Sequence, residues 1–242
     1  LHIKTSLMAE SLMDKGLLEG TETDRVFRPM PDLQVIKLGG QSIIDRGREV
    51  VLPLLDEIVA ARNQHQLLVM TGGGTRSRHA YAIALDLGMP TGVLAKLGAS
   101  ISEQNALMLA VLLAPHGGLN IGHDDLVKLP AYLRLGIIPV MHGMPPYDYF
   151  ALPVAKSRIP IHRTDVGTLV IADLIGARSC IFVKDERGLY TDDPKKNSKA
   201  KFIPEISVQD LLKKNLDDLI IERPCLDILL NSEVIDRIQI IN

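Results

Sequence analysis

The chain has 242 residues, of which 46% are hydrophobic and 23% are charged, and its formal net charge is −2. This composition is typical of a globular protein, and the small net charge excludes a general attraction to nucleic acid or to an anionic membrane. The two cysteines, Cys180 and Cys225, lack the spacing of a metal or redox motif. We therefore expect a cytoplasmic protein with buried, reduced thiols and with neither nucleic acid nor a membrane as partner.

The first 31 residues are predicted to be an extension with a tendency to form helix, ending at Pro29 and Pro31. This segment carries acidic residues and no long apolar run, so it fits neither a secretory signal nor a membrane span. Such extensions are often poorly attached or pack on a partner subunit. Residues 32–242 are predicted to form a single α/β domain.

Within that domain, strand-like and helix-like segments alternate. Apolar runs rich in β-formers end at glycines, and the segments that follow them have helical periodicity. Strands that alternate with helices favour a three-layer α/β/α sandwich with a mostly parallel central sheet. The predicted strands are 33–40, 66–74, 135–143, one that begins at 179, and 237–242; the predicted helices are 48–66, 77–88, 99–114, 164–177, 207–216 and 225–235.

Three turns that follow predicted strands carry the candidate binding residues. The first turn, "KLGGQS", combines Lys37 with Gly39, Gly40 and Ser42, so that a positive charge, bare amides and a hydroxyl can surround phosphate oxygens. An ordinary strand-to-helix turn is the alternative. Because ligands bind beyond the carboxyl ends of parallel strands, we expect all three turns to share one edge of the sheet.

The second turn, "TGGGTRSRH", contains Gly73 and Gly74 and then Arg76 and Arg78. Guanidinium groups bind oxyanions through two hydrogen bonds at a time. Positive side chains at the start of a helix oppose its dipole unless an anion balances them, which favours an anion site here over a pair of solvated arginines.

The third turn, "FVKDERGLYTDDP", offers a cation, an aromatic ring and acids that could hold a base and a ribose. The alternative is a loop whose glycine and proline serve only turn geometry. Its candidate residues are Lys184, Asp185, Gly188, Tyr190 and Asp193.

Two common nucleotide motifs are absent from the sequence. There is no G-x-x-x-x-G-K-[ST] motif, and no G-x-G-x-x-G motif follows a strand, which excludes a P-loop protein and a dinucleotide-binding fold. Seven histidines are scattered without metal-ligand spacing, so each one is by itself more typical of a surface or core residue.

Four ordered motifs, "VIKLGGQS", "TGGGTRSRH", "RTDVGTLVIADLIGA" and "FVKDERGLYTDDP", resemble those of the amino-acid kinase family, which includes uridylate kinase, acetylglutamate kinase and aspartokinase. With "GMPPY", the set is most similar to the molybdenum-storage branch of that family, and within it to the beta-type chains. The resemblance runs from about Leu33 to Asn242. It also implies a further segment after Asn242, so the C-terminal end is expected to be shortened.

The resemblance implies roles for individual residues. Lys37 would bind the transferring phosphoryl group, and Asp165 would organise the lysines. Lys184, Tyr190 and Asp193 would contact the base and sugar of the nucleotide. The full set implied for nucleotide binding is Gly39, Gly40, Ser42, Gly73, Gly74, Arg76, Lys184, Asp185, Gly188, Tyr190 and Asp193.

For function, the resemblance implies storage of polyoxomolybdate clusters in a hetero-oligomeric cage of alternating alpha-type and beta-type chains, loaded with the help of ATP and Mg²⁺. The alpha-type chains carry a histidine cluster after "PPY", whereas here Asp148, Tyr149 and Phe150 follow it. The candidate metal contacts of this chain are therefore His123, His142 and His162. A small-molecule kinase, such as uridylate kinase, is the alternative function.

Overall fold

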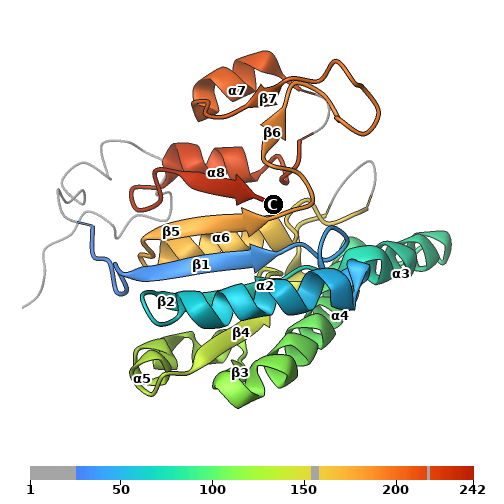
Figure 1. Ribbon diagram of the computed structural model, residues 1–242. Coiled ribbons are helices and arrows are strands. Elements are labelled where there is room, and N and C mark those ends of the chain that lie inside the picture. The colour runs from blue at the N-terminus through green and yellow to red at the C-terminus, as the bar shows by residue number, and fades with distance from the viewer. Residues whose placement is uncertain (1–25, 154–157, 217–218) are drawn as a thin grey trace, which may run out of the picture.

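The computed structural model describes residues 26–153, 158–216 and 219–242, and its centre is a six-stranded, entirely parallel sheet (Figure 1). The strand order is β3-β4-β2-β1-β5-β8. The strands are β1 (Leu33–Leu38), β2 (Gln66–Thr71), β3 (Gly118–Asn120), β4 (Ile138–His142), β5 (Ser179–Val183) and β8 (Ile238–Ile241).

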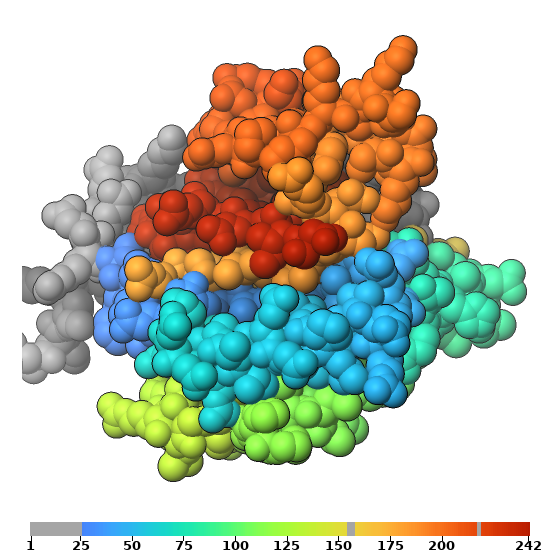
Figure 2. All heavy atoms as spheres, in the orientation of Figure 1, coloured from blue at the N-terminus to red at the C-terminus, as the bar shows by residue number. Residues whose placement is uncertain are grey.

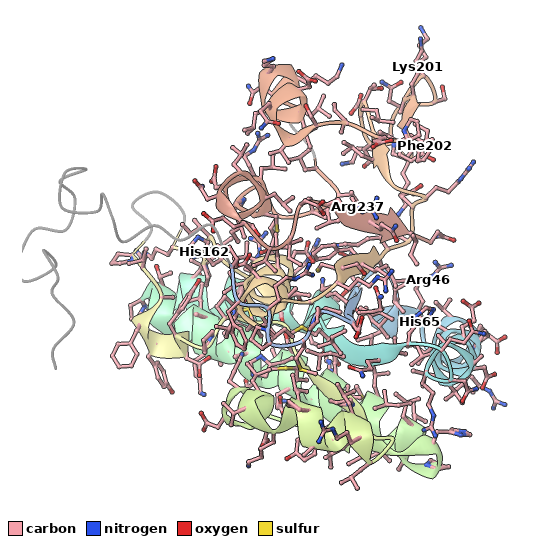
Figure 3. All side chains as sticks on the ribbon, turned by 90° about the vertical axis from the view of Figure 1, so that its left-hand side faces the viewer. Arg46, His65, His162, Lys201, Phe202 and Arg237 are labelled. Carbon is pink, nitrogen blue, oxygen red and sulfur yellow. The ribbon has the colours of Figure 1, made fainter. Side chains whose placement is uncertain are left out.

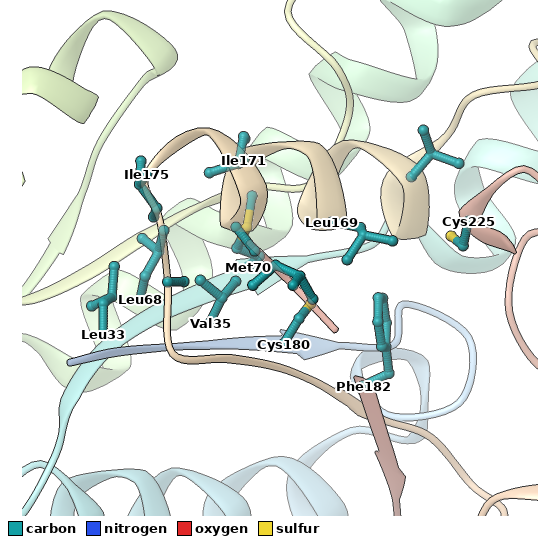
Figure 4. Close-up of a cluster of buried hydrophobic side chains, with 14 of the residues drawn as sticks. Leu33, Val35, Leu68, Met70, Leu169, Ile171, Ile175, Cys180, Phe182 and Cys225 are labelled. Atoms are coloured by element: carbon teal, nitrogen blue, oxygen red, sulfur yellow. The ribbon is translucent and has the colours of Figure 1, made fainter. Parts of the chain in front are cut away.

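Helices cover both faces of this sheet. One hydrophobic cluster joins α2 (Arg48–Ala61) and α4 (Thr91–Leu113) to one face, where Leu67 and Val69 of β2 point. The other cluster, part of which Figure 4 shows, joins α6 (Thr164–Leu174) and α8 (Cys225–Asn231) to the opposite face, where Leu68 and Met70 point. Because successive residues of a strand point to opposite faces, the uninterrupted apolar run of β2 serves both layers. The predicted α/β/α sandwich is confirmed.

The remaining elements lie around the two ends of the sheet. Helix α3 (Gly74–Asp86) extends beyond the carboxyl ends of the strands, and α5 (Leu129–Arg134) lies near their amino ends (Figure 1). The short antiparallel strands β6 (Leu189–Tyr190) and β7 (Phe202–Ile203), together with α7 (Val208–Lys214), form a lobe that projects from the body (Figure 2). Short 3₁₀ helices lie at Ile44–Arg46, Ala114–His116, His123–Lys128 and Asp148–Phe150.

Sequence periodicity misplaced several boundaries. Helix α4 begins at Thr91, eight residues before the predicted start at 99, and α3 begins at Gly74 rather than at 77. Strands β3, β6 and β7 were not predicted. They span three, two and two residues, which is too short for an alternating pattern to emerge.

Helix α4 has the length and composition of a membrane span over Thr91–His116, but 44% of its most apolar window is buried in this fold. Leu94 and Leu109 have no more than 1% of their surface exposed. Packing on the sheet and on α3 accounts for part of the apolar character of α4, whereas Leu107, Met108, Val111 and Leu112 are exposed.

The end of the predicted extension packs against the domain. The backbone N–H of Met30 donates to the carbonyl of Ile175 at 2.8 Å, and the Arg28 guanidinium donates to the carbonyls of Gly176 and Ala177. Residues 1–25 of that extension lie outside the described residues. The boundary predicted at residue 31 stays a prediction.

Candidate functional site

A buried charged triad forms where β1 and β5 end. Lys37 Nζ lies 2.5 Å from Asp165 Oδ1, and Lys184 Nζ lies 2.9 Å from Asp165 Oδ2. The exposed fractions of Lys37, Asp165 and Lys184 are 3%, 4% and 8%. Lys37 belongs to β1, Lys184 directly follows β5, and Asp165 lies in the first turn of α6. The first and third turns therefore meet at one edge of the sheet, as expected.

The triad has more positive than negative charge. Burial alone would raise the pKa of Asp165, but the charges of Lys37 and Lys184 outweigh it and hold this pKa well below its ordinary value. Burial and the like charge of Lys37 lower the pKa of Lys184. Two ammonium groups that share one carboxylate leave a positive potential suited to a multiply charged anion.

The glycines of the first two turns are in contact beside this triad. A Cβ on Gly40 would lie 2.1 Å from the Gly74 nitrogen, and a Cβ on Gly72 would lie 3.3 Å from Lys37 Nζ. Only glycine fits at Gly40, because the obstructing atoms belong to backbone. The second turn therefore also reaches the shared edge, and it brings bare amides next to the Lys37 ammonium.

The start of α3 already has an acidic neighbour. The Thr75 N–H donates to Asp45 Oδ2 at 2.6 Å, and the carboxylate of Asp45 lies against Gly74. A carboxylate at this position is stabilised by the helix dipole. Asp45 was not predicted as a neighbour of α3, because it lies in the 3₁₀ helix at 44–46, which follows the first turn and not the second.

Arg76 is engaged by α4 rather than turned toward the glycines. Its guanidinium donates to Gln104 Oε1 at 3.0 Å and to Asn105 Oδ1, and Asn105 Nδ2 donates to the Gly72 carbonyl at 2.6 Å. This network fixes the second turn. A nucleotide contact for Arg76 stays a prediction, as do those for Gly39, Ser42 and Gly73.

A cavity of about 330 Å³ opens beside the second turn. Ser77 Oγ is buried and has no hydrogen-bond partner among the described residues, and Ser77 also lines this cavity. Arg78 and Arg163 add two guanidinium groups to the lining, and Tyr81, whose pKa burial raises to about 12, adds a neutral hydroxyl. Glu222 also lines the cavity and pairs with Arg163, so Arg78 and the Ser77 hydroxyl are the lining groups that suit an oxyanion.

The third turn divides its side chains between the triad and the lobe. Lys184 points inward to Asp165, whereas Asp185 pairs with Lys195 at the surface. Tyr190 packs edge-on against Phe202 of β7, with the ring centroids 5.5 Å apart. Asp193 accepts from the Lys195 N–H at 2.9 Å, which is a turn contact. Gly188, with φ +156°, lies beside Phe202.

Of the candidate metal contacts, His123 and His142 lie together and His162 pairs elsewhere. The rings of His123 and His142 are 4.6 Å apart, while His162 Nδ1 lies 2.6 Å from the Tyr147 hydroxyl. Burial and the neighbouring His123 lower the pKa of His142 to about 4. Within the described ranges, no group of three or more His, Cys, Asp or Glu side chains could hold a metal ion. Figure 3 places His162 apart from Lys201 and Phe202 of the lobe.

Polar atoms without partners surround the His123–His142 pair. Glu103 Oε2 lies 4.0 Å from His142 Nε2, and Asn120 Nδ2 donates to Glu103 Oε1 at 2.6 Å. Buried atoms with no hydrogen-bond partner among the described residues include Glu103 Oε2, Asn120 Oδ1, His142 Nδ1 and Asp148 Oδ1. Such atoms are costly unless water or a ligand satisfies them.

Sequence reasoning missed Glu222, which contacts the triad from the C-terminal part of the chain. Its carboxylate accepts from the N–H groups of Arg163, Asp165 and Val166 at 2.9, 3.2 and 3.2 Å. Glu222 has only 9% of its surface exposed, and burial together with Asp165 raises its pKa. No local pattern marks this residue, since its partners lie 56 to 59 residues earlier in the sequence.

The chain is similar in sequence and in fold to known proteins. The chain is 49% identical over 241 residues to molybdenum storage protein subunit beta of Azotobacter vinelandii. This alignment covers 100% of this chain and 89% of that protein. It is 26% identical over 181 residues to uridylate kinase of Pyrococcus abyssi, covering 74% of each. The crystal structure of uridylate kinase from Archaeoglobus fulgidus shares the fold with a TM-score of 0.66 at 22% identity, over 86% of this chain and 89% of that one.

The family assignment rests on the whole domain rather than on one motif. The model of the amino acid kinase family matches residues 32–235, which include the three turns, the triad and Glu222. The chain therefore belongs to the amino acid kinase family, and its full-length relationship is to a molybdenum storage protein subunit.

Proposed function

We propose that this protein stores molybdenum inside the cell as polyoxomolybdate, in a hetero-oligomeric cage with an alpha-type paralogous chain, and that ATP drives loading. The observation that carries the proposal is the 49% identity to a molybdenum storage subunit over the full chain. The triad of Lys37, Asp165 and Lys184 beside the glycine turns supports the nucleotide part.

In this proposal the triad and the glycines bind the phosphates of ATP. Lys37 contacts the transferring phosphoryl group, while the amides near Gly40 and Gly74 approach the phosphate chain. Phosphoryl transfer needs mainly positioning and fixed positive charge, which two buried lysines supply. Mg²⁺ would enter as a complex with the phosphates of the nucleotide. When bound, it would neutralise charge on the phosphate oxygens.

The metal-oxo cargo is assigned to the region around His123 and His142. The low pKa of His142 keeps its imidazole neutral near neutral pH, which is the form that binds metals. Glu103 and Asn120 have buried oxygens without partners there. His162 is a third candidate contact at a separate position, beside Tyr147. Completion of such a site by residues of the alpha-type chain is part of the proposal.

A small-molecule kinase, such as a uridylate kinase, is the second candidate. The cavity beside the second turn favours it, because Ser77, Arg78 and Arg163 could hold a phosphorylated acceptor there. In the storage proposal, the same cavity admits an inorganic oxyanion. The two functions therefore differ in the acceptor and not in the nucleotide site.

The test is to incubate the purified chain, alone and with an alpha-type chain, with ATP, Mg²⁺ and molybdate, and to measure molybdenum retained per protein. A parallel reaction contains UMP in place of molybdate. Retained molybdenum that depends on ATP supports storage. Stoichiometric phosphorylation of UMP without retained molybdenum would refute storage and favour the kinase. The matched variants are Lys37→Ala in the triad and Lys199→Ala on the surface.

A further inference from the structure

Glu222 holds Asp165 from two directions. The carboxylate of Glu222 accepts from the backbone N–H of Asp165, and the backbone N–H of Glu222 donates to Asp165 Oδ2 at 3.3 Å. The two residues are 57 positions apart in the sequence. Both the main chain and the side chain of Asp165 are therefore fixed by the same residue.

The start of α6 would be uncapped without Glu222. The residue that precedes this helix, Arg163, makes no side-chain hydrogen bond to the helix start. The first N–H groups of a helix have no partners within the helix, and buried ones need acceptors from elsewhere. Glu222 supplies two carboxylate oxygens to three of these groups, including that of Val166.

Capping alone does not explain why a buried carboxylate has this task. A neutral side chain from Ser, Thr or Asn just before the helix satisfies the same N–H groups without a buried charge. Here a second carboxylate lies beside Asp165, where repulsion between the two opposes its ionisation. The carboxylate fixes the main chain that carries Asp165, whereas the bond from the Glu222 backbone N–H to the Asp165 side chain does not depend on the side chain at position 222.

We propose that Glu222 is a positioning residue for phosphoryl transfer: it acts through Asp165 to hold the Lys37 and Lys184 ammonium groups in the geometry that the reaction requires. The inference rests on the proposed use of the triad in ATP turnover. Asp165 contacts both lysines, so a displacement of its carboxylate moves both cations at once. Errors of about 1 Å in such positions cost about 100-fold in rate.

Several charged or polar groups face Glu222: the charges of Asp165, Arg163 and Lys37 act on its carboxylate, and its own charge acts on Lys184, Tyr81 and Tyr147. Arg163 Nε lies 3.5 Å from Glu222 Oε1, and the Cys225 N–H donates to the Glu222 carbonyl at 3.0 Å, which fixes the backbone at the start of α8. The lysines are held by Asp165 rather than by Glu222 itself. A variant at Glu222 therefore tests positioning without removing a phosphate-binding cation.

The experiment compares Glu222→Gln and Glu222→Asp with Glu233→Gln, an exposed glutamate outside the site. The assay is ATP hydrolysis with Mg²⁺ and molybdate, using the assembled protein, with kcat and KM measured separately. For Glu222→Gln we expect kcat to fall about 10- to 100-fold while KM for ATP stays within about twofold. Glu222→Asp keeps the charge and should recover part of kcat. Glu233→Gln should match the wild type.

Two results would overturn the inference. One is a folded Glu222→Gln variant with unchanged kcat, and the other is an equal change in kcat and in 1/KM, which indicates a role in binding or only in stability. If Glu222→Gln fails to fold, Glu222→Asp decides on the same two readouts. Lys37→Ala tests the proposed function separately: full activity of this variant would refute the use of the triad in ATP turnover, whatever the result for Glu222.

Discussion

Replacing Asp165 by asparagine is the most direct test of the triad. The change keeps the shape of the side chain but removes the charge that pairs directly with the ammonium groups of Lys37 and Lys184. Both lysines are more than nine-tenths buried. Two buried cations that have lost this carboxylate repel each other and lose their strongest hydrogen bonds.

The expected magnitude follows from that burial. Removing one partner of a buried ion pair typically costs about 3–5 kcal/mol, a large part of the roughly 5–15 kcal/mol that stabilises a domain. The variant can limit the loss by deprotonating one lysine. A lysine whose folded pKa is below its unfolded value takes up protons on unfolding, so the stability of the variant should rise with pH between about pH 7 and pH 10.

The wild type should lose stability at acidic pH, where Asp165 becomes protonated. The folded pKa of Asp165 is lowered, so its contribution to stability is fully present above about pH 4, the unfolded value, and is lost as the pH falls below it. Asp165→Asn should lack this component of acid sensitivity. At neutral pH, its ATP turnover should fall more than its ATP affinity, because the lysines remain present but are misplaced.

The assay is urea unfolding of the wild type, Asp165→Asn and the surface control Asp236→Asn at several pH values. A free energy of unfolding for Asp165→Asn within about 0.5 kcal/mol of the control would refute the reasoning. So would a loss of stability that does not change between neutral and alkaline pH.

Three further predictions concern the same edge of the sheet. Gly40→Ala should abolish ATP binding measured by calorimetry, because its Cβ would overlap the backbone of Gly74; intact binding by a folded variant would contradict the contact. Asp45→Asn removes a carboxylate that competes with phosphate for the start of α3, so ATP should bind more tightly. The free energy of unfolding should fall by about 0.5–1 kcal/mol. Weaker ATP binding would argue that Asp45 assists the nucleotide. Arg76→Ala should lower stability with little change in kcat, since this guanidinium is engaged by α4; a kcat loss as large as that of Lys37→Ala would show a direct phosphate contact.

Local patterns in the sequence were sufficient for the layer architecture and for the position of the turns. Apolar runs such as 66–71 end at glycines and alternate with helical periodicity, and these features act over a few neighbouring residues. They placed Lys37 and Lys184 at the carboxyl ends of strands, and the parallel arrangement of those strands brought the two side chains to one edge. The role of Asp165 came from the family resemblance, because nothing in its own segment indicates two lysine partners.

Only the tertiary structure decided which groups surround those residues. Glu222 reaches α6 from 57 residues away, Asp45 crosses from another loop to the start of α3, and Arg76 turns toward α4 instead of toward the glycines. Each of these contacts depends on how separate elements pack, and a sequence window contains only one partner of each pair. The physical reason is that local propensities select strands and helices, whereas the placement of a buried charge is selected by partners that come from distant parts of the chain.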